Sequence, residues 1–132
     1  MTDLTGTWHL HRWHSLKNGV PDGYPMGEDA MGQLLYGQDG EMSAFLMRAD
    51  FAVSRNGPTT DSFLSYAGSW TVVDDEITHL VRFASAAHWI GRPLVRRMRM
   101  EGDALALSTA PETSRSGSVY VHELLWRRHP PI

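Results

Sequence analysis

Residues 67–85 read AGSWTVVDDEITHLVRFAS, and this stretch decides the fold class. Two runs containing Val, Ile, Thr and aromatic residues flank the pair Asp74-Asp75, and side chains within each run alternate between apolar and polar. Period-two alternation is typical of antiparallel strands, and Asp tolerates the backbone conformation that a tight turn needs. The stretch therefore predicts a β-hairpin with strands Ala67 to Val73 and Glu76 to Ser85.

The same pattern continues on both sides of this hairpin. Turn-forming pairs such as Asn18-Gly19, Asp39-Gly40 and Gly102-Asp103 separate further alternating segments. The remaining predicted strands are Gly6 to Leu16, Met31 to Tyr36, Glu41 to Arg48, Leu94 to Glu101, Ala104 to Thr109 and Val119 to Arg127. A short helix is predicted at Thr60 to Leu64, because its start resembles a helix N-cap. Eight antiparallel strands can close on themselves, so we expect an all-β, up-and-down barrel with a central ligand cavity.

Composition limits the classes of function. The 132 residues are enough for one domain, predicted to span residues 1–132, and 42% hydrophobic content is typical of a packed globule. A net charge of -3 argues against nucleic-acid binding. With no Cys there is no disulfide or thiol nucleophile, and no apolar run reaches the roughly 18 residues of a membrane span. We expect a cytoplasmic monomer or homodimer that does not enter a membrane.

The first predicted strand mixes aromatic, basic and histidine side chains. Trp8 and Leu10 assign its even positions to the barrel interior, because the apolar face of a strand packs against the core. Period two then directs Arg12 and His14 inward as well, and directs Trp13 outward.

Polar residues also fall on the predicted inner face of four other strands. The residues that share these faces are His79 with Phe83, Arg96 with Met98, Tyr120 with His122, and Tyr66 with Trp70. So many Arg and His side chains would leave unpaired charge in a dry core, at a cost of several kcal/mol for each ion. We therefore expect a solvated cavity inside the barrel.

These residues suggest a chemistry. Histidine exchanges protons near neutral pH, and arginine stabilises an enolate or carboxylate. The predicted catalytic residues are His14, His79, Arg12 and Arg96. The predicted substrate-binding residues are Tyr36, Tyr66, Trp70, Phe83, Trp89, Met98, Tyr120 and His122. Two functions remain open: a cofactor-free cyclase, isomerase or dehydratase-type lyase for an apolar, polyketide-like carbonyl metabolite, or a carrier of a small hydrophobic ligand.

Other chemistries find little support in the sequence. No Gly-x-Ser-x-Gly elbow and no glycine-rich phosphate loop occurs, which argues against serine hydrolysis and nucleotide cofactors. His9 and His11 have the spacing of a two-histidine metal strand, but they fall on the predicted outer face. We expect neither a metal nor a cofactor. The loop Ser85 to Pro93 is predicted to form a lid over the cavity mouth.

An ordered set of short motifs resembles the lipocalin-like domain family of small bacterial and fungal barrels. The motifs are residues 4–8 (LTGTW), 32–36 (GQLLY), 39–44 (DGEMSA), 66–68 (YAG), 78–79 (TH), 89–91 (WIG), Arg96 and 126–128 (WRR). The resemblance implies a barrel with a ligand cavity, in which Trp8 closes the floor and Arg127 or Arg128 stacks on it. His79 and Arg96 match the family pattern, whereas Arg12 and His14 depart from it. The family shares no single activity, so the resemblance names no reaction.

Overall fold

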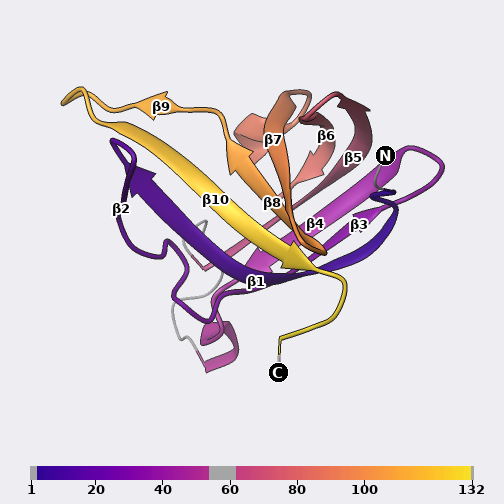
Figure 1. Ribbon diagram of the computed structural model, residues 1–132, viewed down its shortest axis with the longest axis horizontal. Helices are drawn as coiled ribbons and strands as arrows, with labels where there is room; N and C mark the ends of the chain where they lie inside the picture. The colour runs from indigo at the N-terminus through magenta and orange to yellow at the C-terminus, as the bar shows by residue number, and fades with distance from the viewer. Residues whose placement is uncertain (1–2, 54–61, 132) are drawn as a thin grey trace.

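The computed structural model describes residues 3–53 and 62–131 (Figure 1). Strands dominate, and two single-turn 3-10 helices are present, η1 (Phe51–Val53) and η2 (Ala87–Trp89). The strands are β1 (Gly6–Lys17), β2 (Val20–Pro21), β3 (Met31–Tyr36), β4 (Glu41–Met47), β5 (Phe63–Val73), β6 (Glu76–Ala84), β7 (Pro93–Glu101), β8 (Ala104–Thr109), β9 (Glu112–Thr113) and β10 (Val119–Arg127). Neither helix in the described residues is long enough to cross a membrane.

The strands form one antiparallel sheet that closes on itself. Its order is β2-β1-β3-β4-β5-β6-β7-β8-β10-β9, and an additional pairing of β1 with β10 completes the circle. Figure 1 shows these two strands, indigo and yellow, running together along one wall. The two-residue strands β2 and β9 pair only with β1 and β10. The prediction of an eight-stranded, up-and-down barrel is therefore confirmed.

Strand positions agree with the sequence pattern, with one change at β5. This strand begins at Phe63 and not at Ala67, so Phe63 and Leu64 are extended. The short helix predicted over residues 60–64 is therefore wrong for these two residues, and its first two residues lie outside the described part of the chain.

Alternation along the strands builds the core. Trp8, Leu34, Ile77 and Leu105 are almost completely buried and belong to one hydrophobic cluster inside the barrel. On β7 every second residue from Leu94 onward is partly buried, as the alternating sequence predicts.

One end of the barrel is closed by Trp8. Its indole N–H donates to the Leu4 carbonyl at 2.9 Å, and the Arg128 guanidinium lies 3.9 Å from the centre of its ring. The same guanidinium donates to the backbone carbonyls of Thr5 and Asp3, at 2.5 and 2.6 Å. Arg128, and not Arg127, is therefore the stacking partner that the resemblance implied.

A bulge in β1 reverses the inner and outer faces of its second half. The pairing with β10 shifts between Leu10 and Arg12, which leaves an extra residue in β1. Beyond the bulge, Trp13 pairs with Leu124 and is buried, whereas Arg12 pairs with Leu125 and His14 with Glu123 on the other face. The predicted inward orientation of Arg12 and His14 is therefore wrong.

A second bulge lies between β5 and β6. Ala67 pairs with Phe83 and Gly68 with Val81, so one residue of β6 is unpaired. Val81 is buried, but Phe83 is 67% exposed, on the outside of the barrel. The prediction that Phe83 faces the interior is wrong for the same reason as for Arg12. Gly68 allows this close approach, because a Cβ there would lie 1.8 Å from the Leu80 carbonyl oxygen.

Candidate ligand-binding site

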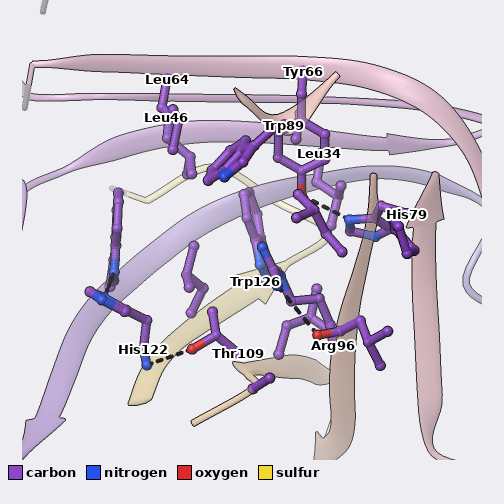
Figure 2. Close-up of a pocket in the computed structure, with 18 of the residues that line it drawn as sticks. Leu34, Leu46, Leu64, Tyr66, His79, Trp89, Arg96, Thr109, His122 and Trp126 are labelled. Atoms are coloured by element: carbon purple, nitrogen blue, oxygen red, sulfur yellow. Dashed lines mark hydrogen bonds between the residues drawn. The ribbon is translucent and has the colours of Figure 1, made fainter. Parts of the chain in front are cut away.

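A cavity of about 470 Å³ lies inside the barrel. This volume falls within the roughly 300–1,000 Å³ that is usual for small-molecule sites. Most of its wall is apolar, and the principal apolar residues are Trp13, Leu34, Leu46, Leu64, Trp89, Leu94, Leu107, Leu124 and Trp126. Figure 2 shows several of them around the polar groups described next.

His79 on β6 lies between two tyrosines. Its Nε2 is 2.6 Å from the hydroxyl oxygen of Tyr36. Its Nδ1 is 2.8 Å from the hydroxyl oxygen of Tyr66, and Figure 2 marks this second hydrogen bond. His79 and Tyr36 are 1% and 2% exposed, and Tyr66 and His79 line the cavity. We call these three residues the Tyr36–His79–Tyr66 network.

Burial fixes the direction of these hydrogen bonds. The Tyr36 hydroxyl makes no other hydrogen bond within the described residues, and a buried donor without an acceptor costs about 1–3 kcal/mol. Tyr36 therefore donates to Nε2 of His79, and the imidazole carries its own proton on Nδ1 and donates it to Tyr66. The Tyr66 hydroxyl accepts this bond and keeps its own hydrogen for an acceptor in the cavity.

The network is uncharged at neutral pH. Burial lowers the pKa of His79 to about 3, and the positive charge of Arg96 adds to the effect. Burial raises the pKa of Tyr36 well above its ordinary value, and it raises that of Tyr66 as well; in both cases Arg96 opposes the rise. All three groups therefore act as neutral hydrogen-bonding groups.

Arg96 on β7 is the permanent positive charge of the cavity wall. Its guanidinium donates one long bond, 3.3 Å, to the carbonyl oxygen of its neighbour Val95, and it forms a side-chain hydrogen bond with Tyr66 that lowers the pKa of that hydroxyl. Of the ion pairs found within residues 3–53 and 62–131, none involves Arg96. Its charge affects the pKa of His79, Tyr66 and His122, which places it within electrostatic reach of all three. Most of its N–H groups are therefore available to a ligand.

A second pair of polar side chains joins β1 to β10 across the cavity wall. The indole N–H of Trp13 donates to Nδ1 of His122 at 3.0 Å, and the His122 backbone N–H donates to the Thr109 hydroxyl at 2.9 Å (Figure 2). Burial lowers the pKa of His122, Glu112 opposes this change, and Arg96 adds to it. Trp13, Thr109, Glu112 and His122 all line the cavity.

The wall also contains a donor without a partner. Trp126 lines the cavity and is 3% exposed, and its indole N–H has no acceptor within the described chain. Together with Tyr66, Arg96 and His122, it makes the polar part of the wall rich in donors. Among the described residues that line the cavity, only Glu112 adds a charged acceptor, its carboxylate.

The structure brings five of the predicted site residues together at this cavity. They are Tyr66, His79, Trp89, Arg96 and His122. Tyr36 lies behind His79 and does not line the cavity. Trp89 belongs to η2, in the loop predicted as a lid, and His88 of the same loop also lines the cavity.

The other predicted residues lie elsewhere. Trp70 and Met98 line a separate hollow, where Trp70 donates its indole N–H to the Gly37 carbonyl at 2.9 Å. The Tyr120 ring lies 6.0 Å from the Lys17 ammonium and does not line the cavity. Arg12, His14 and Phe83 are on the outer face, as described above.

Among the hydrogen-bonding residues of the cavity wall, the predicted site residues did not include Trp13, Thr109, Glu112 and Trp126. Trp13 carried a signal, because a large aromatic residue on an otherwise polar face is unusual and marks a change of face. Thr109 and Glu112 lie at the end of β8 and in β9, and nothing in their local pattern distinguishes them.

Two histidines of β1, His9 and His11, had the spacing of a metal-binding strand. His11 is hydrogen-bonded through Nε2 to the carbonyl of His129 at 2.9 Å. Within the part of the chain that the structure describes, no three His, Asp or Glu side chains gather where they could hold a metal ion.

Fold and site together define a class: a small, closed antiparallel barrel around an apolar cavity with a few polar groups. The comparisons give the family. The family model for the lipocalin-like domain matches residues 5–129, and the chain belongs to that family. No curated protein matches the sequence.

Proposed function

We propose that the cavity binds a small apolar carbonyl compound and activates it for a cofactor-free cyclisation, isomerisation or elimination. The arrangement that carries the proposal is a pair of adjoining donor groups: Arg96 forms a side-chain hydrogen bond with the Tyr66 hydroxyl and has further N–H groups, and the direction of the network leaves the hydroxyl hydrogen of Tyr66 for a ligand. Donors held in a low-dielectric cavity stabilise the negative charge that develops on a carbonyl oxygen. Of the five N–H groups of Arg96, the described residues engage one with the Val95 carbonyl and one with Tyr66, which leaves the others for a ligand.

In this proposal His79 positions Tyr66 and does not itself move a proton to the substrate. Complete transfer along the Tyr36–His79–Tyr66 network would leave a buried phenolate on Tyr36, whose raised pKa opposes that state. The imidazole N–H instead fixes the Tyr66 hydroxyl and supports any negative charge that it acquires. The polarised carbonyl then reacts with a group of the substrate itself, which the cavity holds nearby.

A carrier of a hydrophobic carboxylate or ketone is the second candidate. One observation favours it: the pKa of His79 is about 3 and that of His122 is lowered, so neither histidine is poised as a base near neutral pH. A carrier needs only the Arg96 and Tyr66 donors to hold its ligand.

Infrared spectroscopy of a bound ¹³C-labelled medium-chain ketone tests polarisation directly. We expect the carbonyl stretch to move to lower frequency in the wild-type cavity and to return toward its value in hydrocarbon in Tyr66→Phe and Arg96→Met. Tyr36→Phe is the matched control, because it disturbs the same network without removing a cavity donor. Binding without a frequency shift would contradict the proposal of carbonyl activation.

The choice between enzyme and carrier rests on deuterium exchange. Exchange requires a base that takes the α-proton from the polarised ketone, and the Glu112 carboxylate in the cavity wall is the acceptor for it. An activated ketone should then exchange its α-hydrogens in D₂O faster when bound than when free, by about 10²-fold or more for an effective site. We expect the acceleration to fall in Tyr66→Phe. A ligand that binds and exchanges no faster than in solution identifies a carrier.

A further inference from the structure

The Trp13–His122 hydrogen bond determines which nitrogen of His122 carries the proton. An indole N–H can only donate, so Nδ1 of His122 must be the acceptor and therefore unprotonated. The proton of the neutral ring is then on Nε2. Because protonation of Nδ1 would break the bond, Trp13 also favours the neutral ring.

The Nε2–H of His122 is available to a ligand. No hydrogen bond to it occurs within the described residues, and it is not among the buried atoms that lack a partner. The charged groups that face His122 are Glu112 from β9 and Arg96 from β7. Neither forms a hydrogen bond with the ring.

Two donor groups therefore stand apart on the cavity wall. One is Tyr66 with Arg96, on β5 and β7, and the other is His122, on β10, held by Trp13 of β1. Figure 2 shows Tyr66 with His79 at one side of the cavity and His122 with Thr109 at the other. Trp126 is labelled between them, with an indole N–H that has no acceptor within the described residues.

From this arrangement we propose that the substrate carries two separated oxygen acceptors on an apolar skeleton, as in a diketone or a keto acid, and that Trp13 is the positioning residue for the second acceptor. This inference rests on the proposed function, because it takes the first acceptor to be the carbonyl held by Tyr66 and Arg96. It adds that His122 binds the second oxygen because its neutral ring carries the proton on Nε2.

Long-range ¹H–¹⁵N correlation spectra test the tautomer. We expect wild-type His122 to show an unprotonated Nδ1 and a protonated Nε2 at neutral pH. In Trp13→Phe we expect a mixture of tautomers and protonation of the ring at a higher pH. A proton on Nδ1 in the wild-type protein would overturn the assignment.

Affinity for matched ketones tests the substrate class. The probes are 2-nonanone and the nonanediones with the second carbonyl at position 4, 6 or 8, measured by tryptophan fluorescence. We expect at least one dione to bind about 3- to 10-fold more tightly than the monoketone, the gain of one hydrogen bond. His122→Phe should abolish this preference, so that the diones and 2-nonanone bind this variant with similar affinities, and Trp13→Phe should reduce it. His129→Phe, an exposed histidine, is the control.

The possible failures are distinguishable. If no ketone binds the wild-type protein, the proposed function fails and this inference fails with it. If 2-nonanone binds but no dione binds more tightly, or if the preference survives His122→Phe, the proposed function stands and the second acceptor site is wrong.

Discussion

The guanidinium groups of Arg128 and Arg96 have different surroundings in the same barrel. Arg128 stacks on Trp8 and donates to two backbone carbonyls, so its donors are used within the protein. Arg96 makes one long bond to its own neighbour and one side-chain hydrogen bond with Tyr66, and it lines the cavity. The comparison shows that the surroundings of the guanidinium, and not the residue type, separate a structural arginine stacked on Trp8 from one that lines the cavity and is available to a ligand.

Substitutions at the closed end of the barrel, formed by Trp8 and Arg128, should lower stability more than substitutions at the cavity. We expect Trp8→Ala to lower the free energy of unfolding by about 3–5 kcal/mol, because it removes a fully buried indole and the surface on which Arg128 stacks. Trp89→Ala at the cavity should cost only about 1 kcal/mol, since Trp89 is partly exposed. Urea titration measures both, and equal losses would contradict the distinction between floor and cavity.

His79 should make stability depend on acidity. Its pKa is about 3 in the folded protein and about 6.5 when unfolded, so the unfolded state binds the extra proton between these values. Stability is therefore complete above pH 6.5 and falls as the pH decreases toward 3, by on the order of 2–3 kcal/mol between pH 6 and pH 4. His79→Gln should flatten this dependence relative to the wild type, whereas His129→Gln should leave it unchanged. Urea titrations across the pH range measure it, and an unaltered slope in His79→Gln would refute the assignment.

Replacing each arginine by Met should separate the two roles. Arg128→Met is expected to cost about 1–3 kcal/mol of stability, because it removes two charge-assisted bonds. Arg96→Met should leave stability within about 0.5 kcal/mol and weaken ketone binding about 10-fold. Thermal unfolding and fluorescence titration of each variant test this pair, and the reverse pattern would exchange the two roles.

Arg127 has a third kind of environment, a surface ion pair, and its substitution is expected to change stability least. It pairs with Asp103 at 3.1 Å on the surface, where Asp103 is largely exposed. Exposed ion pairs contribute about 0–1 kcal/mol and are screened by salt. Arg127→Gln should therefore change the free energy of unfolding by less than about 0.5 kcal/mol, and by less still at 1 M NaCl. If Arg127→Gln lowered the free energy of unfolding as much as Arg128→Met, the surface ion pair would stabilise the protein as much as the contacts of Arg128 do.

The sequence predicted the barrel because turn pairs and alternation repeat throughout the chain. It predicted His79 and Arg96 at the cavity because the alternation of inner and outer side chains in their strands is uninterrupted as far as those residues. It failed for Arg12 and His14, because a bulge next to Leu10 reverses every later position of β1. Nothing in the polar sequence around His11 marks that bulge, except that Trp13 falls on the face assigned to solvent.

The predicted inward orientation of Phe83 was wrong for a similar reason, but in this case the sequence contained a sign of the bulge. Gly68 lies inside a strand, where glycine often marks a bulge or a close approach of two backbones. The structure shows both, since the bulge in β6 faces Gly68. The sequence could not predict the Tyr36–His79–Tyr66 network. The network joins side chains of three strands, and which of these side chains meet depends on the register that the bulges set.

Closure of the barrel through β1 and β10 also has a kinetic consequence. Trp13 and His122 meet across this seam although they are 109 residues apart in the sequence. Contacts between such distant residues form only after a large loss of chain entropy, which slows folding. The seam is therefore expected to assemble late, and the cavity reaches its final shape with it. Trp13, a ring at the seam, offers an intrinsic optical probe of that last step.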